Sequence, residues 1–259
     1  MPAMRKRLGF SAWIAAVGLW LAASGAAAEE IRALCAGATK VAVTELARSF
    51  HAATGDGVAL AFDTVGGIRQ RLAKGEAADV AIVSREVLDD MERAEVTVPG
   101  VKFDLGTVGI GVAVRAGAPL PDIATPEALR QTLLAAKSIV AVDPAAGGTS
   151  GIHFAKVLER LGIAEQIRSR LRLLPGGFVA EAVAKGEAEL AVTQITEILP
   201  VAGVRLAGPL PAELQKTTTY SGAIIRHTPA AEAATRFLRY LAGDTGRAGF
   251  AAAGFGKPD

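Results

Sequence analysis

Four short segments carry residue types that could hold a small anion. They are residues 37–40, 63–67, 147–151 and 175–177, and each contains glycine and comes before a stretch with a helical pattern. Glycine lets the backbone approach a ligand, and the free N–H groups and dipole of a helix start favour negative charge. The candidate ligand-binding residues in and near these segments are Thr39, Lys40, Thr64, Gly66, Gly67, Arg69, Arg85, Gly148, Thr149, Ser150, Gly151 and Gly177.

Two further residues could move a proton. His153 lies one turn into the helix predicted after residues 147–151, where an imidazole could serve as acid, base or anion donor. Cys35 ends the first predicted strand, beside residues 37–40. Each candidate also has a structural alternative, because a histidine or cysteine there can simply be packed, Thr149 and Ser150 can cap a helix, and the basic side chains can be solvated.

Composition and motifs argue against several classes of protein. One Cys and three His among 259 residues speak against a disulfide framework and a zinc enzyme. The sequence has no phosphate loop, no nucleophile elbow, no His-Glu-x-x-His and no dinucleotide fingerprint. No basic stripe with interleaved aromatic residues suggests nucleic-acid binding. We therefore expect neither a cofactor nor a metal nor a nucleic-acid partner.

The first 28 residues have the pattern of a secretory signal peptide. A basic start at residues 5–7 leads into the apolar run 8–23 and the small residues Ala26-Ala27-Ala28. Cleavage after Ala28 would remove three of the 28 basic residues and none of the 26 acidic ones, so the formal charge of +2 would become −1. Both Trp residues would also leave, which makes a sugar ligand a poor candidate. The pattern predicts export to the periplasm.

Apolar stretches of two periodicities alternate along the rest of the chain. Strands are predicted at 31–35, 58–62, 80–83, 107–115, 138–142, 171–174, 190–193 and 219–226. Helices are predicted at 41–54, 68–74, 86–94, 126–136, 152–161, 178–185 and 229–242. Such alternation with short turns predicts an α/β protein with parallel sheets covered by helices on both faces.

A pattern in the first half of the chain recurs in the second half. Gly66-Gly67 and a short helix lead to Lys74-Gly75-Glu76-Ala77 and a strand, and Gly176-Gly177 leads in the same way to Lys185-Gly186-Glu187-Ala188. Chance is one explanation, since Lys-Gly is a common helix end. The other explanation is two lobes of one α/β design, which could face each other across a cleft.

Two segments of the chain read FDTVGGIRQRLAKGEAADVAIV and DPAAGGTSGIHFAKVLERLGI. With them the chain resembles the molybdate-binding-protein-like branch of the type 2 periplasmic solute-binding proteins. The resemblance implies two Rossmann-like lobes that close on a ligand, one of residues 29–107 with 196–259 and the other of residues 108–195. It also implies a monomer whose partners are a small anionic ligand and the membrane subunits of an ABC importer.

The chain departs from the molybdate-binding pattern where that family holds its ligand. Ala38 and Thr39 stand near a usual serine, and residues 64–66 replace a serine pair. Gln194 stands near a frequent tyrosine and so joins the candidate ligand-binding residues, and Ser84-Arg85 replaces a usual acidic residue. The loss of hydroxyl donors beside basic side chains favours a carboxylate-bearing ligand over molybdate.

Two functions remain open at this point. One is a binding protein that captures an organic polycarboxylate for an ATP-driven importer. The other is a cofactor-independent isomerase on the same fold, because the branch includes aconitate isomerase, which shifts a double bond between trans- and cis-aconitate by proton transfer. In that case Lys40, Arg69 and Arg85 could anchor carboxylates, and His153 or Cys35 could move the proton.

Overall fold

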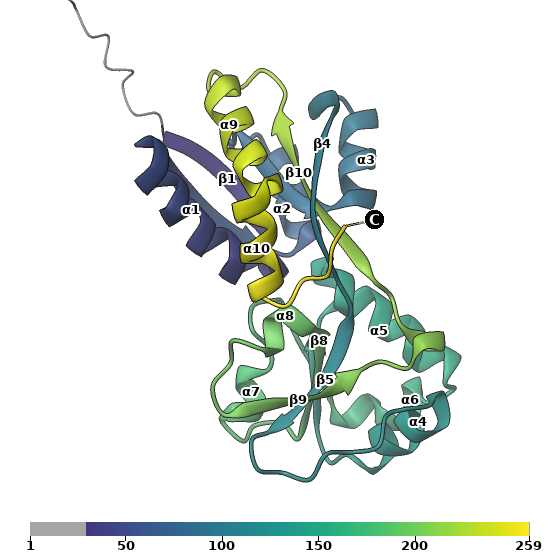
Figure 1. Ribbon diagram of the computed structural model, residues 1–259. Coiled ribbons are helices and arrows are strands. Elements are labelled where there is room, and N and C mark those ends of the chain that lie inside the picture. Colours follow the sequence, from purple (N-terminus) through teal and green to yellow (C-terminus); the bar gives the residue numbers. More distant parts are fainter. Residues whose placement is uncertain (1–29, 259) are drawn as a thin grey trace, which may run out of the picture.

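The chain folds into two α/β lobes joined at a narrow waist (Figure 1). The structure is a computed structural model that describes residues 30–258. The expected signal peptide of residues 1–28 lies outside the described residues. Among residues 30–258 no helix has the length and apolar character that a membrane crossing requires.

The first lobe is a mixed five-stranded sheet in the order β2-β1-β3-β10-β4. β1 is parallel to β2 and β3, and β10 is antiparallel to β3 and β4. The strands are β1 (Glu30–Ala36), β2 (Gly57–Asp63), β3 (Val80–Ser84), β4 (Thr97–Val108) and β10 (Thr218–Ile225). The helices are α1 (Lys40–Thr54), α2 (Val65–Ala73), α3 (Arg85–Arg93), α9 (Ala231–Ala242) and α10 (Asp244–Ala252). Every residue of β3 is buried, as expected for a central strand covered on both faces.

The second lobe repeats this design with the order β7-β6-β8-β5-β9. β6 is parallel to β7 and β8, and β5 is antiparallel to β8 and β9. The strands are β5 (Ile110–Arg115), β6 (Ile139–Val142), β7 (Leu171–Leu174), β8 (Leu190–Gln194) and β9 (Val204–Pro209). The helices are α4 (Pro126–Ala135), α5 (Thr149–Arg160), α6 (Ala164–Ile167), α7 (Glu181–Ala184) and α8 (Ile195–Ile198). The predicted α/β class with two lobes is thus confirmed.

Three sequence expectations about the sheets need correction. Both sheets are mixed rather than parallel, because β10 in the first sheet and β5 in the second run antiparallel to both of their neighbours. The predicted strand 107–115 is two strands, with β4 ending in one lobe and β5 starting in the other. β9 belongs to the second sheet, although the expected boundary at residue 195 placed its residues with the first lobe. Alternation of apolar residues predicts a strand but not the sheet it joins.

The two lobes are connected at the waist by two neighbouring chain segments. Gly109 separates β4 from β5, and Gln215 lies in the segment that leads back from β9 to β10. The Gln215 amide binds both backbone groups of Ile110, because Ile110 N donates to Oε1 at 2.9 Å and Nε2 donates to Ile110 O at 2.9 Å. The side chain of Gln215 therefore joins the two connecting segments by hydrogen bonds at the point where they are not paired as strands.

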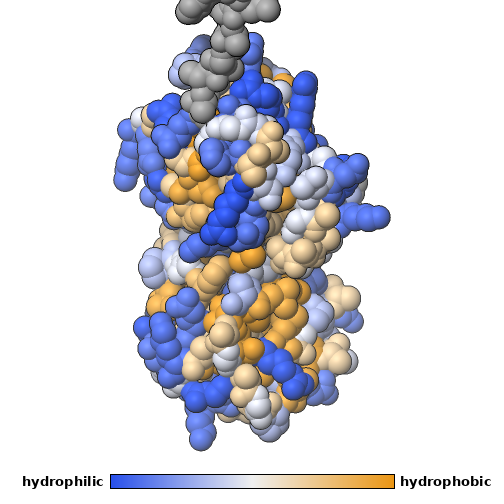
Figure 2. All heavy atoms as spheres, turned by 60° about the vertical axis from the view of Figure 1, so that its left-hand side comes forward, coloured by the Kyte–Doolittle hydropathy of each residue, from blue (hydrophilic) through white to orange (hydrophobic). Residues whose placement is uncertain are grey.

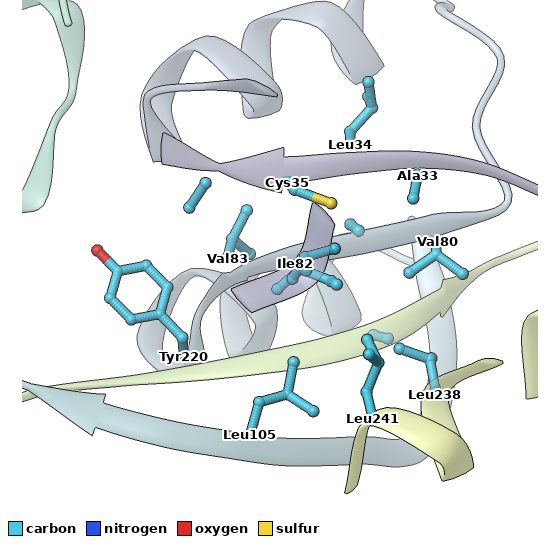
Figure 3. Close-up of a cluster of buried hydrophobic side chains, with 14 of the residues drawn as sticks. Ala33, Leu34, Cys35, Val80, Ile82, Val83, Leu105, Tyr220, Leu238 and Leu241 are labelled. Atoms are coloured by element: carbon cyan, nitrogen blue, oxygen red, sulfur yellow. The ribbon is translucent and has the colours of Figure 1, made fainter. Parts of the chain in front are cut away.

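Each lobe buries its own apolar core. In the first lobe, residues of β1, β3 and β10 pack against α9, and Cys35 lies among them (Figure 3). In the second lobe, α4 and α5 cover one face of the sheet and α7 and α8 the other. The space-filling view shows the waist again and shows apolar side chains gathered on one face of the second lobe (Figure 2). Two separate cores allow the lobes to move as units about the waist.

Candidate functional site

A cavity of about 520 Å³ lies between the lobes and takes its walls from both. The first lobe contributes the ends of β1 and β2, the starts of α1 and α2, and Tyr220 of β10. The second lobe contributes the start of α5, the segment from β7 to α7, Gln194 at the end of β8 and Glu197 of α8. Ligands of open α/β sheets bind beyond the carboxyl ends of the parallel strands, and this cavity occupies that position.

Three helix starts converge on the cavity. The side chain of Thr64 caps α2 by accepting a hydrogen bond from Gly67 N at 2.9 Å. α5 begins at Thr149, directly after Gly148, and residues 37–39 form a 3₁₀ turn that leads into α1. The first N–H groups of a helix have no partner within it, so each of these starts favours a negative group of a ligand.

Lys40 supplies a positive charge to the cavity wall. Its ammonium lies over two aromatic rings, 5.9 Å from the centroid of Phe62 and 5.3 Å from that of Phe178. Phe62 comes from the first lobe and Phe178 from the second, so the cation bridges the cleft. Among the residues that the structure describes, no carboxylate lies within ion-pair distance of Lys40. Its charge is therefore available to an anion.

The other cations of the cavity lining are already paired with carboxylates. Arg172 Nη1 lies 2.8 Å from Glu187, and Lys185 Nζ lies 3.3 Å from Glu181. These four side chains are on the second lobe, and each is about half exposed. Their charges compensate one another. Lys40 is therefore the cation of the cavity lining that has no carboxylate partner among the described residues.

A polar network joins the two lobes across the inner wall. Thr149 Oγ1 lies 3.0 Å from the hydroxyl of Tyr220, and Gln194 Nε2 donates to Thr149 Oγ1 at 3.0 Å and to the Tyr220 hydroxyl at 3.3 Å. Burial raises the pKa of Tyr220 above its ordinary value, so the hydroxyl keeps its proton. Oε1 of Gln194 is buried and has no hydrogen-bond partner among the described residues.

Glu197 is a buried carboxyl in this inner wall. Glu197 is 7% exposed, and its Oε2 accepts a hydrogen bond from Thr193 Oγ1 at 2.5 Å. A Cβ placed on Gly37 would lie 3.0 Å from Oε1, so that oxygen faces the space that a missing side chain leaves. Burial raises the pKa of Glu197 to about 7, and the bond from Thr193 offsets only part of this effect. The carboxyl can therefore gain and lose a proton near neutral pH.

The structure brings about half of the sequence-predicted residues into the cavity lining. These are Lys40, Thr64, Gly148, Thr149, Ser150, Gly177 and Gln194. Three other predicted residues support the lining from behind. The buried hydroxyl of Thr39 donates to Ala36 O at 2.8 Å. Gly67 N donates to Thr64 Oγ1, the cap of α2. Gly151 packs so tightly on Val142 that a Cβ on Gly151 would lie 2.2 Å from the Val142 carbonyl oxygen.

The remaining predicted residues lie outside the cavity lining. Arg85 forms an ion pair with Asp104, and Arg69 and Gly66 line a separate hollow of about 300 Å³. His153 lines that hollow too, and its Nε2 lies 2.7 Å from Leu214 O. Cys35 is buried in the core of the first lobe, where burial raises the pKa of its thiol (Figure 3). Neither His153 nor Cys35 thus reaches the space in which a ligand would lie.

Sequence reasoning missed Glu197 and Tyr220. Glu197 is a single acid within the otherwise uncharged stretch 190–204, and that isolation is the signal that could have drawn attention to it. Tyr220 is one of two tyrosines and belongs to a strand otherwise made of small and aliphatic residues. Its hydroxyl points away from Leu238 and Leu241 of the core (Figure 3). Tertiary contacts alone bring it beside Thr149.

Two lobes that enclose a cavity at converging helix starts define the fold of periplasmic binding proteins. The periplasmic molybdate-binding protein of Azotobacter vinelandii superposes with a TM-score of 0.75 at 20% identity, covering 88% of this chain and 100% of that one. The sulfate-binding protein SubI of Mycobacterium tuberculosis H37Rv gives a TM-score of 0.67 at 16% identity, covering 88% and 86%. At these identities the likeness establishes the fold alone.

The chain belongs to the bacterial extracellular solute-binding protein family, whose model matches residues 31–256. A curated relative, the aconitate isomerase of a Pseudomonas species, is 34% identical over 215 residues, which are 81% of this chain and 80% of the relative. The predicted resemblance to molybdate-binding-like proteins is confirmed by the family model and by the fold.

Proposed function

We propose that this protein binds a small organic acid with several carboxylates in the cavity between its lobes. The observation that carries the proposal is Lys40, an uncompensated ammonium that lies over Phe62 and Phe178 beside three helix starts. A ligand with more than one carboxylate can meet the ammonium and a helix start at the same time. The aromatic walls suit the carbon skeleton that joins the carboxylates, and a tetrahedral oxyanion would leave them uncovered.

Calorimetric titration tests this proposal directly. We expect trans-aconitate and citrate to bind and molybdate and sulfate to bind much more weakly. Lys40→Met should lower the affinity for the organic acids at least about tenfold, because a charge-assisted contact contributes on the order of 1.5–3 kcal/mol. Lys74→Met is the matched control, since Lys74 is exposed at the end of α2 and absent from the cavity lining. Tight binding of molybdate without any binding of an organic acid would refute the proposal.

One fate of the bound acid is delivery to an ATP-driven importer from the periplasm. Membership of the solute-binding family supports it, as do the molybdate- and sulfate-binding proteins that share the fold and the signal-peptide pattern of the sequence. Cells that lack the protein should then take up the radiolabelled acid more slowly. Uptake at the unchanged rate would count against delivery.

The other fate is isomerisation of the acid within the cleft, as in an aconitate isomerase. The specific support is the Pseudomonas relative, which the chain matches over 80% of the relative's length. Proton NMR of trans-aconitate with the purified protein separates the two fates. The appearance of cis-aconitate without added cofactor favours isomerisation, whereas a bound and unchanged acid favours delivery.

A further inference from the structure

We propose that Glu197 is the group that transfers a proton to and from the acid bound in this cleft. The inference rests on the proposed binding of a polycarboxylate and assigns a chemical role within the same site. It concerns a residue that none of the sequence patterns singled out.

The position of Glu197 suits a reacting group. It lies on α8, one turn after β8, and its side chain reaches the cavity between the start of α1 and the end of β8. Thr193 fixes one carboxyl oxygen at 2.5 Å, and the other faces the backbone of Gly37. One oxygen is thus held by Thr193, while the other lies beside Gly37, which also lines the cavity. A base must be held in this way to reach a substrate hydrogen.

The surroundings of Glu197 favour proton exchange over permanent ionisation. Among the described residues no cation lies within ion-pair distance of its carboxylate. Tyr220 is the titratable group coupled to it, and Lys40 lies in the lining of the same cavity. Burial without a cation destabilises the ionised form and raises the pKa to about 7. A buried carboxyl of this kind costs folding stability, which is typical of groups retained for chemistry.

The other carboxylates of the cavity lining have different partners. Asp63 accepts a hydrogen bond from Thr64 N at 2.7 Å and lies 3.8 Å from Arg71. Glu181 and Glu187 pair with the basic side chains Lys185 and Arg172. Glu197 is the carboxyl of the lining that lacks such a partner among the described residues.

The proton shift balances without any co-reactant. In an unsaturated acid with a methylene group next to the double bond, the Glu197 carboxylate takes a proton from the methylene carbon. The electron pair of that C–H bond forms the new C=C bond, and the electron pair of the old C=C bond takes a proton at the far carbon. The Glu197 carboxylic acid returns that proton, so the product has the same atoms and charge. Negative charge that builds on the ligand carboxylate is stabilised by Lys40 and the helix starts.

The proposal is tested by comparing the wild-type protein with the Glu197→Gln variant. Each is incubated with trans-aconitate in D₂O, and proton NMR follows the conversion. We expect kcat to fall at least about 100-fold in the variant, as for the loss of a general acid–base group. Binding of citrate should change little, because Gln resembles the protonated acid and can still accept the bond from Thr193. The turnover rate of the wild-type protein should change slope near pH 7, as expected from the pKa of about 7 of Glu197.

Two further variants keep the test decisive. Glu232→Gln is the control, because Glu232 is exposed in the first turn of α9 and its loss should leave turnover unchanged. If Glu197→Gln fails to fold, Glu197→Asp retains the carboxyl at a shorter reach and should be slow with its pH dependence intact. A wild-type protein that binds no organic acid would refute the binding proposal itself. Binding without conversion, or equal turnover in Glu197→Gln, would refute the role of Glu197 and leave binding standing.

Discussion

Gly66 and Gly147 join the two lobes through their backbones at the edge of the cleft. Gly66 N donates to Gly147 O at 3.1 Å, and next to this bond Thr64 Oγ1 donates to Ala146 O at 2.5 Å. Gly66 lies in the first turn of α2, and Gly147 lies just before α5. The start of a helix in one lobe therefore contacts the segment before a helix in the other, which holds the cleft closed.

We expect Gly66→Ala to hold the lobes apart. A Cβ at Gly66 would lie 2.7 Å from Gly147 Cα and 3.2 Å from Ala146 O, and neither backbone atom can move without opening the contact. Affinity for the best organic acid should fall at least about tenfold. Small-angle scattering should show a more extended particle. Gly208→Ala is the control, because a Cβ there meets nothing closer than 3.5 Å, and equal affinity in both variants would contradict the closed contact.

Glu197 should make the folded protein less stable as the pH rises from about 4.5 to 7. Its pKa is about 7 in the folded state and 4.5 as an ordinary value, so the folded state binds more protons between these limits and loses stability as they leave. The full loss above pH 7 is on the order of 3 kcal/mol. Urea unfolding should therefore find Glu197→Gln more stable than the wild type at pH 8, with the advantage gone at pH 4. A variant less stable at pH 8 would contradict this.

Asp79 should be a structural residue of the first lobe. Its carboxylate is 1% exposed, accepts hydrogen bonds from the Arg32 backbone at 2.7 Å and from Thr228 Oγ1 at 2.6 Å, and pairs with the Arg32 guanidinium at 2.9 Å. Burial acts to raise its pKa, but these partners outweigh burial and lower it to about 2. Asp79→Asn should cost about 2–3 kcal/mol of unfolding free energy at pH 7.

The stabilisation of the fold by Asp79 should decrease as the pH falls. Its pKa is lowered from 3.8 to about 2 on folding, so its stabilisation is present above pH 4 and disappears as the pH falls toward 2. Unfolding curves of the wild type and Asp79→Asn should converge over that interval, while citrate affinity at pH 7 stays equal. A loss of affinity in a folded variant would instead connect Asp79 to the ligand.

Cys35 should be inert in the folded protein. The thiol is fully buried in the core of the first lobe, and burial raises its pKa, so little thiolate forms. A thiol reagent should label the protein only after denaturation, and Cys35→Ala should bind and turn over ligand as the wild type does. Labelling of the native protein at a rate typical of an exposed thiol would contradict the burial.

Much of the fold followed from local patterns. The apolar run 80–83 predicted a strand, which the structure shows buried in the first sheet. The predicted helix 126–136 does begin at Pro126, where Thr125 Oγ1 accepts a hydrogen bond from Ala128 N at 3.1 Å. β9 and α10 lacked a clear pattern and were missed, since partly exposed strands and short helices depend on what they pack against. The directions of β5 and β10 could not be predicted, because periodicity contains no information on pairing partners.

The candidate site divides in the same way between sequence and tertiary structure. The glycine segments, Thr64, Thr149 and Lys40 were found because turn and cap chemistry is local, and a helix start favours anions wherever the chain folds. The network of Thr149, Gln194 and Tyr220 joins residues up to 71 positions apart, and only the packing of the two lobes brings them together.

The sequence by itself thus determined two α/β lobes with anion-favouring turns. The tertiary structure decided which turns face one cavity, and it placed His153 and Cys35 outside it. It also decided the protonation of Glu197. The pKa of a carboxyl depends on desolvation and on the charges around it, and these exist only once distant segments have packed together.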